Sequence, residues 1–327
     1  MQEQTDGPKA PRQVGGALAV CVVAGFCALG GFATGWLWRP LPPKPAVVLA
    51  HAAHKRLPPP PPPYTFPAGG RVLAGAYRFV ALYGSPDEPA LGALGQQGIA
   101  DAVSRAKQVA DPYRPLSSQP ILPAFEIIAT VASGTPTENG DYSREVDPAK
   151  IMDWVHAARD AGMYVVIDLQ PGRSDFLSQA KQYETVLREP NVGLALDPEW
   201  RLTQSQRPLE QIGSVGIDEV NGVASWLSSL VATEHLPQKL FVLHQFRLDM
   251  LPSRELLNTA HPELAFVIQM DGQGDQPAKQ NTWQAITASP PPNVEFGWKN
   301  FYMKDSPMLD PAATMQIAPQ PWYVSYQ

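Results

Sequence analysis

The stretch Val192-Gly-Leu-Ala-Leu-Asp-Pro-Glu-Trp200 has the pattern of a buried strand that ends in two acids. Because side chains alternate between the two faces of a strand, Leu194 and Leu196 share one face. The opposite face carries two small residues followed by two acids, Gly193, Ala195, Asp197 and Glu199. In a parallel α/β barrel, catalytic residues occur at the C-terminal ends of the strands. The stretch therefore favours a barrel strand with an acidic pair at the barrel mouth.

Short apolar runs with the length of strands recur through the rest of the chain. The eight runs are Phe79–Gly84, Ile121–Val131, Met163–Leu169, Val192–Asp197, Lys239–Phe246, Ala265–Asp271, Val294–Trp298 and Trp322–Tyr326. The amphipathic stretches between them are Leu91–Val109, Pro148–Ala161, Phe176–Leu187, Ile217–Thr233, Ser253–Thr259, Pro277–Thr287 and Pro311–Gln316. Eight strands, each but the last followed by a helix, predict a (β/α)8 TIM barrel over residues 71–327. An open doubly wound sheet is the alternative, but no glycine-rich phosphate loop follows the first run.

The N-terminal part of the chain has a different composition. Residues 14–38 carry no charge and are long enough to cross a bilayer as a helix, and Trp36, Trp38 and Arg39 mark its end. We expect a short tail at 1–13, a transmembrane signal anchor at 14–38 and a proline-rich linker at 39–70. The six prolines Pro58 to Pro63 favour an extended spacer. The barrel is then expected outside the cell membrane.

Charge and cysteine content narrow the possible functions. The net charge of −6 and the absence of a Lys/Arg cluster argue against a nucleic-acid partner. Both cysteines, Cys21 and Cys27, lie in the apolar N-terminal segment, so the barrel has no disulfide, thiolate metal site or cysteine nucleophile. We expect neither a cofactor nor a bound metal.

Polar and aromatic residues gather at the predicted strand ends. They are Glu126, Asp168, Gln170, Asp197, Glu199, Trp200, His244, Gln245, Gln269, Asp271, Trp298, Lys299 and Trp322. Paired acids suit proton transfer or nucleophilic attack, amides recognise hydroxyl groups, and flat aromatic rings stack on sugars. This composition indicates a sugar site, with Glu199, Asp197 and Asp168 as catalytic residues and the others as substrate-binding residues.

Each of these residues also has a structural interpretation. Asp197 before Pro198 can end the strand in a turn. Glu126 can be a buried acid with a basic partner, and His244 a core histidine. Asp168 and Gln170 can cap a loop, and the tryptophans can be packing residues.

Three elements of this pattern resemble the chitinase-type (family 18) glycoside hydrolases. They are Asp197-Pro-Glu199 on the fourth strand, Gln269-Met-Asp271 on the sixth and Trp322 at the eighth. The resemblance implies that Glu199 is the general acid. Gly193 and Ala195 stand where that family has further acids, and Pro198 interrupts the motif. The resemblance therefore indicates a glycoside-hydrolase-like barrel rather than chitinase activity.

Three functions follow from these observations. The first is a membrane-anchored glycosidase acting on cell-envelope or extracellular polysaccharide, in which Glu199 protonates the leaving oxygen. Asp197 or Asp168 is then a nucleophile or base, or orients a substrate acetamide. The second is a non-catalytic glycan-binding or envelope scaffold protein. The third is a metal-dependent hydrolase using His244 with aspartates, which the lack of a close histidine pair disfavours.

Overall fold

The computed structural model describes residues 63–327. The predicted tail, the predicted membrane anchor and most of the predicted linker lie outside this range. Among residues 63–327, no helix is both long enough and apolar enough to cross a membrane.

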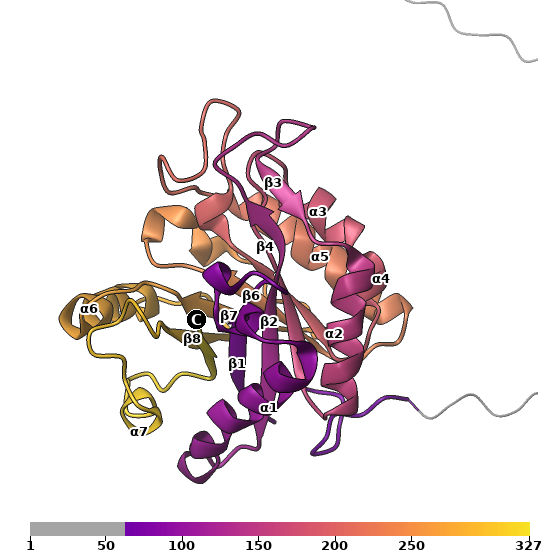
Figure 1. Cartoon of the computed structure of the whole chain (residues 1–327), viewed down its shortest axis with the longest axis vertical. Helices are drawn as coiled ribbons and strands as arrows, with labels where there is room; N and C mark the ends of the chain where they lie inside the picture. Colours follow the sequence, from indigo (N-terminus) through magenta and orange to yellow (C-terminus); the bar gives the residue numbers. More distant parts are fainter. Residues whose placement is uncertain (1–62) are drawn as a thin grey trace, which may run out of the picture. The chain divides into compact units, whose positions relative to one another are not determined.

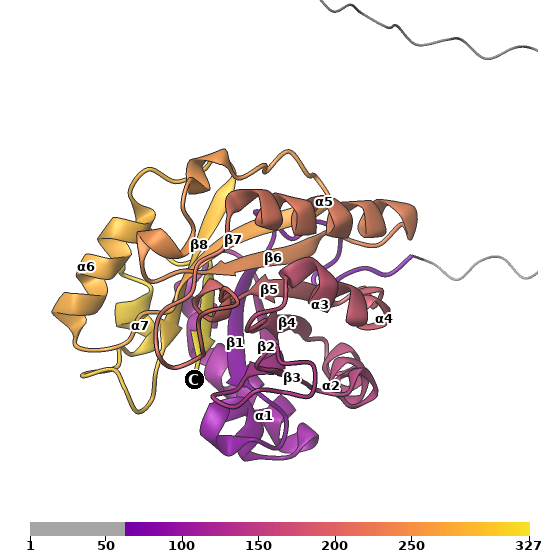
Figure 2. The ribbon, with the colours of Figure 1, turned by 90° about the horizontal axis from the view of Figure 1, so that it is seen from above.

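Eight parallel strands close into a barrel, as the sequence predicts (Figures 1 and 2). Strand β1 (Arg78–Gly84) pairs with β2 (Ile121–Ala132) on one side and with β9 (Tyr323–Tyr326) on the other, which closes the ring. The remaining barrel strands are β4 (Tyr164–Leu169), β5 (Val192–Leu196), β6 (Lys239–His244), β7 (Leu264–Met270) and β8 (Val294–Asn300). The prediction of a (β/α)8 barrel is thus confirmed for the described residues.

One strand of the sheet was not predicted. Strand β3 (Ser143–Glu145) runs antiparallel to the C-terminal end of β2. It is only three residues long and two of them are exposed, so it leaves no apolar run in the sequence. The register of β2 on β4 shifts between Ile128 and Thr130, at the point where the pairing of β2 with β3 begins.

Helices cover the outside of the barrel, with α2 to α5 beside β2 to β6 and with α6 and α7 beside β8 (Figures 1 and 2). The α-helices are α1 (Ile99–Ala110), α2 (Pro148–Asp160), α3 (Phe176–Gln182), α4 (Glu184–Leu187), α5 (Ile217–Thr233), α6 (Gln276–Thr287) and α7 (Pro311–Thr314). The 3-10 helices are η1 (Pro89–Leu91), η2 (Ala93–Gln96), η3 (Asp111–Leu116), η4 (Pro198–Trp200), η5 (Leu248–Met250) and η6 (Arg254–Leu256).

Three of the predicted helices differ from the observed ones. The helix predicted at Leu91–Val109 is the shorter α1, which is preceded by the 3-10 helices η1 and η2. The helix predicted at Ser253–Thr259 is only the short η6, because Ser253 adopts a left-handed conformation (φ 58°) that starts a tight turn. The helix predicted at Phe176–Leu187 is divided into α3 and α4 at Tyr183. The Tyr183 hydroxyl donates to the carbonyls of Ala129 and Val146, which fixes this residue against β2.

An aspartate N-cap begins four of the helices. Asp147, Asp175, Asp275 and Asp310 each accept a hydrogen bond from a backbone N–H in the first turn of α2, α3, α6 and α7. Such a cap satisfies an N–H group that has no partner within the helix. A proline stands in the first two positions of α2, α6 and α7, where its missing N–H costs nothing. Each cap therefore sets where a covering helix begins.

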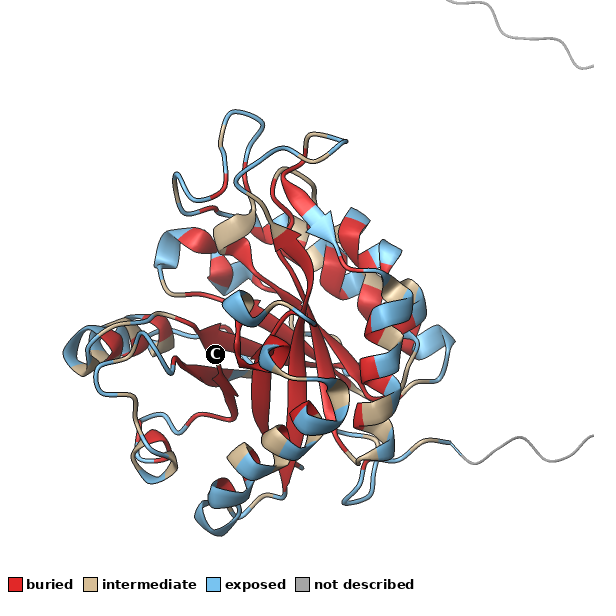
Figure 3. Cartoon of the chain, viewed as in Figure 1, coloured by how far each residue is buried: buried red, intermediate tan, exposed pale blue. Residues whose placement is uncertain are grey.

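The barrel interior follows the alternation predicted for β5. Ala195 packs inside the barrel, whereas Leu194 and Leu196 pack outward under the helices. Gly193 also faces inward, because a Cβ there would lie 2.9 Å from the Cβ of Leu240, which packs inside the barrel with Ala195. The barrel strands are buried along nearly their whole length, and most of the exposed residues lie on the outer helix faces, in the loops and on β3 (Figure 3). The next inward position after Ala195 is therefore Asp197, and Glu199 follows in the 3-10 helix η4, beyond the end of the strand.

Candidate functional site

The barrel interior changes from apolar to polar toward the C-terminal ends of the strands. Apolar side chains such as Phe79, Val166 and Val242 fill the lower interior. Above them the inward positions carry polar groups, which are Tyr83 on β1, Glu126 on β2, Asp168 on β4, Asp197 after β5, His244 on β6, Gln269 and Asp271 at β7, and Lys299 on β8. All of these residues are buried. Alternation along eight parallel strands therefore brings predicted site residues from six of the strands to one end of the barrel.

The centre of this cluster is His244, which stands between two carboxylates. Its Nε2 donates to Oε1 of Glu126 at 2.7 Å, and its Nδ1 donates to Oδ2 of Asp271 at 2.9 Å. Burial lowers the pKa of His244, but the charges of Asp168 and Glu126 and the two hydrogen bonds raise it well above the ordinary value. Because both ring nitrogens face carboxylates, the ring is a charged imidazolium.

Two tyrosines donate hydrogen bonds to acids of the cluster. The Tyr83 hydroxyl donates to Oδ2 of Asp168 at 2.9 Å, and the Tyr323 hydroxyl donates to Oε2 of Glu126 at 3.1 Å. Burial raises the pKa of Asp168, and the charge of Glu126 adds to this, although His244 and other partners oppose it. The second oxygen of Asp168, Oδ1, is buried and has no hydrogen-bond partner among residues 63–327. Asp168 is therefore held in place while one of its oxygens stays free to act.

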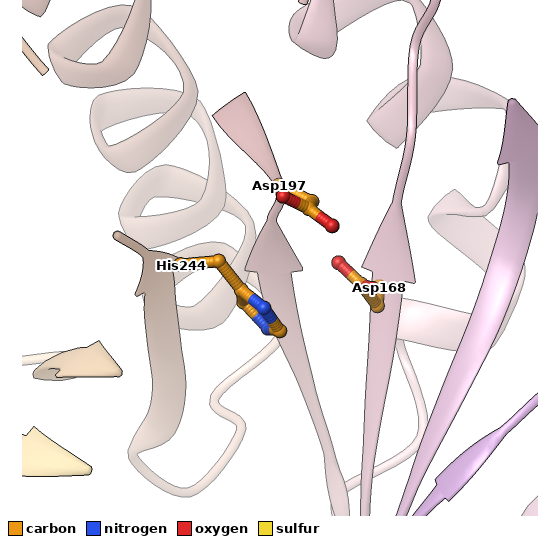
Figure 4. Close-up of side chains that lie close together, drawn as sticks. All are labelled: Asp168, Asp197 and His244. Atoms are coloured by element: carbon orange, nitrogen blue, oxygen red, sulfur yellow. The ribbon is translucent and has the colours of Figure 1, made fainter. Parts of the chain in front are cut away.

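Asp197 faces Asp168 across the tops of β5 and β4 (Figure 4). Its side chain is 2% exposed, and no hydrogen bond from the described part of the chain reaches its buried Oδ1. Burial and then the charge of Glu199 raise its pKa well above the ordinary value, with Asp168 and Asp271 adding to the effect. Figure 4 also shows the His244 ring beside the two carboxyl groups.

Glu199 lies two residues beyond Asp197 in the short helix η4 and is partly exposed. Burial and then the neighbouring charge of Asp271 raise the pKa of Glu199 to about 7, against the opposing charges of Lys299 and His244. A carboxyl group with this pKa carries its proton in about half of the molecules near neutral pH. This is the property that a general acid requires.

Lys299 provides the second cation of the cluster. Its side chain is 2% exposed, and its Nζ lies 3.3 Å from the centre of the Tyr83 ring. No ion pair to Lys299 forms within the part of the chain that the structure describes. Lys279 donates to the backbone carbonyl of Lys299 at 2.7 Å and to Oδ2 of Asp305 at 2.6 Å, which fixes the end of β8.

Asp168, Asp197 and His244 also meet the distance requirement for a shared metal ion. Their ligand atoms all lie within 4.8 Å of one another. A histidine ligand must offer a nitrogen lone pair to the metal. In His244 both nitrogens are engaged by Glu126 and Asp271. The donor set therefore fits a metal poorly, and it suits the exchange of protons between carboxyl groups.

Several predicted site residues do not reach this cluster. Gln170 accepts the backbone N–H of Ala132 and so caps the end of β2. Gln245 follows the inward His244 and points outward, where its side chain bonds the Arg247 carbonyl and Arg254. The structural interpretation, a loop-capping role, is therefore the one that describes Gln170.

The predicted tryptophans lie at three different places. Trp298 precedes the inward Lys299, so it faces outward and packs edge-on against Trp283 at 5.5 Å. Trp322 lies before the start of β9 and packs on Phe79, at the opposite end of the barrel from the acids. Trp200 alone stays near the acids, in η4 beside Glu199. The structure does not bring Trp298 and Trp322 to the candidate site.

Two residues of the cluster were not predicted, Tyr83 and Tyr323. Tyr83 shares its face of β1 with Phe79 and Ala81, so the alternation at the end of the first strand could have identified it. Tyr323 begins β9 far from its C-terminal end, and only its long side chain brings the hydroxyl to Glu126. No sequence signal marks that contact.

Comparison with known proteins finds no matching family model and no matching curated protein. Solved structures with a similar fold include a xylanase-A-amylase inhibitor protein (XAIP-III), 12% identical, with a TM-score of 0.43 over 76% of this chain and 92% of that chain. The xylanase and alpha-amylase inhibitor protein XAIP-II from Scadoxus multiflorus is also 12% identical, with a TM-score of 0.41 and the same coverage. An endo-beta-N-acetylglucosaminidase from Cordyceps militaris is 12% identical, with a TM-score of 0.34 over 77% of this chain and 82% of that chain. The chemistry assigned to this chain rests on its own geometry.

Proposed function

We propose that this protein is a glycoside hydrolase in which Glu199 is the general acid. The observation that carries the proposal is a partly exposed carboxyl group at the barrel mouth whose pKa is raised to about 7. It stands next to a second acid, Asp197, whose buried Oδ1 has no hydrogen-bond partner among residues 63–327. Cleavage of a glycosidic bond requires a carboxyl group that holds a proton near neutral pH and a second carboxyl group beside it.

The second carboxyl group is Asp197 or Asp168. Either one acts as nucleophile or base, or orients a substrate acetamide if the substrate assists its own cleavage. A separation of about 5–5.5 Å between the two working carboxyl groups favours retention of configuration, and about 6.5–9.5 Å favours inversion. His244 lies beneath these acids, and its hydrogen bond to Glu126 fixes the positively charged ring next to Asp168.

The proposed substrate is a polysaccharide of the cell envelope or of the extracellular space. This part of the proposal is supported by the uncharged segment at 14–38 and by the proline-rich stretch that follows it. A chain anchored in this way outside the membrane would meet envelope glycans rather than intracellular metabolites.

The decisive experiment measures the release of reducing ends from envelope polysaccharides by the full-length chain. Glu199→Gln should abolish release without lowering the melting temperature, because Gln keeps the shape of the side chain and removes an acid whose raised pKa costs stability at neutral pH. Glu145→Gln is the matched control, since Glu145 is exposed on β3. Wild-type release by Glu199→Gln would remove Glu199 from the mechanism.

One observation favours a second candidate function, non-catalytic glycan binding. Cavities of about 370 and 350 Å³ are formed by described residues before β2 and before β6, at the N-terminal end of the barrel and away from Glu199. Asp168 and Asp197 are deeply buried and only Glu199 is partly exposed, so a substrate would have to displace the loops that follow the strands in order to reach both working acids. Binding of a glycan with no release of reducing ends by the wild-type chain would support this second function.

A further inference from the structure

We propose that the glycan recognised at this site carries a free, protonated amine, as in a glucosamine-type sugar, and that this amine binds among Asp168, Asp197 and Asp271. The inference rests on the proposed function for the location of the site. It goes further by naming the chemical group that the site selects.

The first argument is an imbalance of charge. The polar cluster contains five carboxyl groups, Glu126, Asp168, Asp197, Glu199 and Asp271, and two cations, His244 and Lys299. His244 is shared by Glu126 and Asp271, and Lys299 lies over the Tyr83 ring without an ion pair in the described chain. In the free protein the raised pKa values of Asp168, Asp197 and Glu199 let protons neutralise these acids, and a bound cation would take the place of those protons.

The second argument is an imbalance of hydrogen-bonding groups. Four buried oxygens at this end of the barrel have no donor within residues 63–327, namely Asp168 Oδ1, Asp197 Oδ1, Asp271 Oδ1 and Gln269 Oε1. Gln269 is an independent sign of a ligand, because it is neutral, fully buried and inward-facing beside His244. Its Nε2 is used by Ser325, so only its acceptor oxygen is left without a partner. Buried acceptors without donors are costly to maintain.

An ammonium group matches this set better than the other groups of a sugar. It has three N–H donors and no acceptor, so every contact with a carboxylate or an amide oxygen is favourable. An acetamide would bring a carbonyl oxygen into a site already rich in acceptors. A hydroxyl group would satisfy fewer oxygens and leave the charge unbalanced.

The protonation of the acids supports the same conclusion. Burial, with the charges of neighbouring acids, raises the pKa of Asp197, Asp168 and Glu199. A bound ammonium would favour their ionised forms and expel protons, so affinity for an amine should rise with pH until the amine itself deprotonates. The titratable and charged groups facing the site are Tyr83, Glu126, Asp168, Asp197, Glu199, His244, Asp271, Lys299 and Tyr323.

The test is calorimetric binding to the full-length Glu199→Gln variant, which removes hydrolysis from the measurement. The probes are three β-1,4-linked trimers of equal length, built from glucosamine, N-acetylglucosamine and glucose. We expect the glucosamine trimer to bind about tenfold or more tightly than the other two at neutral pH. Adding Asp197→Asn should remove most of that preference and leave the affinity for the glucose trimer nearly unchanged.

A control separates the site from general attraction of a cation to a chain of net charge −6. Adding Glu145→Gln removes one acid from the exposed surface of β3 and should leave the preference intact. Equal affinity for the three trimers, no binding of any of them, or equal losses from Asp197→Asn and Glu145→Gln would overturn the inference. The hydrolase proposal is judged separately by reducing-end release from the wild-type chain. Amine-selective binding without release would refute hydrolysis and support the amine site.

Discussion

The Nε2 atom of His244 lies 2.7 Å from Oε1 of Glu126, a residue 118 positions earlier in the chain. The other ring nitrogen bonds Asp271, so one imidazolium joins β2, β6 and the end of β7. Burial raises the pKa of Asp271, but the hydrogen bond and the charge of His244 outweigh it and hold the pKa below the ordinary value. The positive charge of His244 is therefore hydrogen-bonded to Glu126 and Asp271, and Asp168 and Asp197 make no hydrogen bond to it.

His244→Gln should destabilise the barrel strongly. It leaves Glu126 and Asp271 buried without their cation, which costs about 3–5 kcal/mol for a broken buried pair. Because the folded-state pKa of His244 is raised above 6.5, its contribution is fully present below pH 6.5 and is lost as pH rises through the raised value. Urea unfolding across this pH range measures the difference. His156→Gln changes an exposed histidine and should cost less than about 0.5 kcal/mol. Equal losses of unfolding free energy in the two variants would show that the ion pairs of His244 with Glu126 and Asp271 do not stabilise the barrel.

Asp197→Asn should stabilise the protein at neutral pH and destroy activity. The raised pKa of Asp197 means that the folded state keeps a proton which the unfolded state releases near pH 3.8. Wild-type stability therefore falls as pH rises from 3.8 through the folded-state pKa, and asparagine avoids this loss. A gain of roughly 0.5–2 kcal/mol is typical when an unfavourable functional group is replaced. Thermal melts at pH 4 and pH 8 should show the gain only at pH 8, and a loss at both would contradict the prediction.

The sequence predicted the barrel because its physical signals are local. The alternation of β5 placed Ala195 inside and Leu194 outside, and Asp197, directly after the strand, is the next inward position. Likewise, Asp147 with Pro148 marked the start of α2, which begins where predicted. Such signals depend on a strand or helix alone and not on its neighbours.

The contacts between strands were not readable from the sequence. Whether Glu126 and His244 were functional or structural stayed open, and the structure shows them joined to each other, which no local pattern encodes. Gln245 and Trp298 were predicted as site residues because they lie near strand ends, although the alternation of side chains along their strands points both outward. A strict alternation test on each strand would have removed these two and added Tyr83.

The rate of glycan cleavage should fall as pH rises through about 7. Glu199 must carry a proton to act as a general acid, and its pKa is raised to about 7 by burial and by Asp271. Above that pH the protonated fraction, and with it kcat/KM, drops about tenfold per pH unit. A pH profile of reducing-end release tests this. Glu145→Gln should keep the same profile, and a rate that is flat between pH 6 and 9 would exclude Glu199 as the acid.

Ala195→Leu should overpack the barrel interior. Ala195 is fully buried and pairs with Val242 on β6, so three additional carbons have no space. Such overpacking costs roughly 1–3 kcal/mol. Ala100→Leu makes the same chemical change on the exposed face of α1 and should have little effect on urea unfolding. Equal stability of the two variants would mean that this face of β5 is not interior, and the inward position of Asp197 would be lost with it.

Composition places the start of the barrel domain at residue 71. We expect the folding unit to begin earlier than that. Phe66 is 2% exposed and lies inside the N-terminal end of the barrel, where it packs edge-on against Tyr77 at 5.9 Å and in a tilted arrangement against Tyr164 at 6.0 Å. A fragment of residues 63–327 should therefore unfold cooperatively and well above the temperature of a fragment of residues 71–327.

Phe66→Ala in the longer fragment isolates the cause of that difference. Loss of a buried phenylalanine ring costs about 3–5 kcal/mol, so this variant should lose most of the stability that separates the two fragments. Val72→Ala, at an exposed position nearby, is the control and should change little. If both fragments melt at the same temperature, Phe66 does not stabilise the barrel and the folding unit begins at residue 71. If the longer fragment shows no cooperative transition, the barrel needs residues before 63 in order to fold.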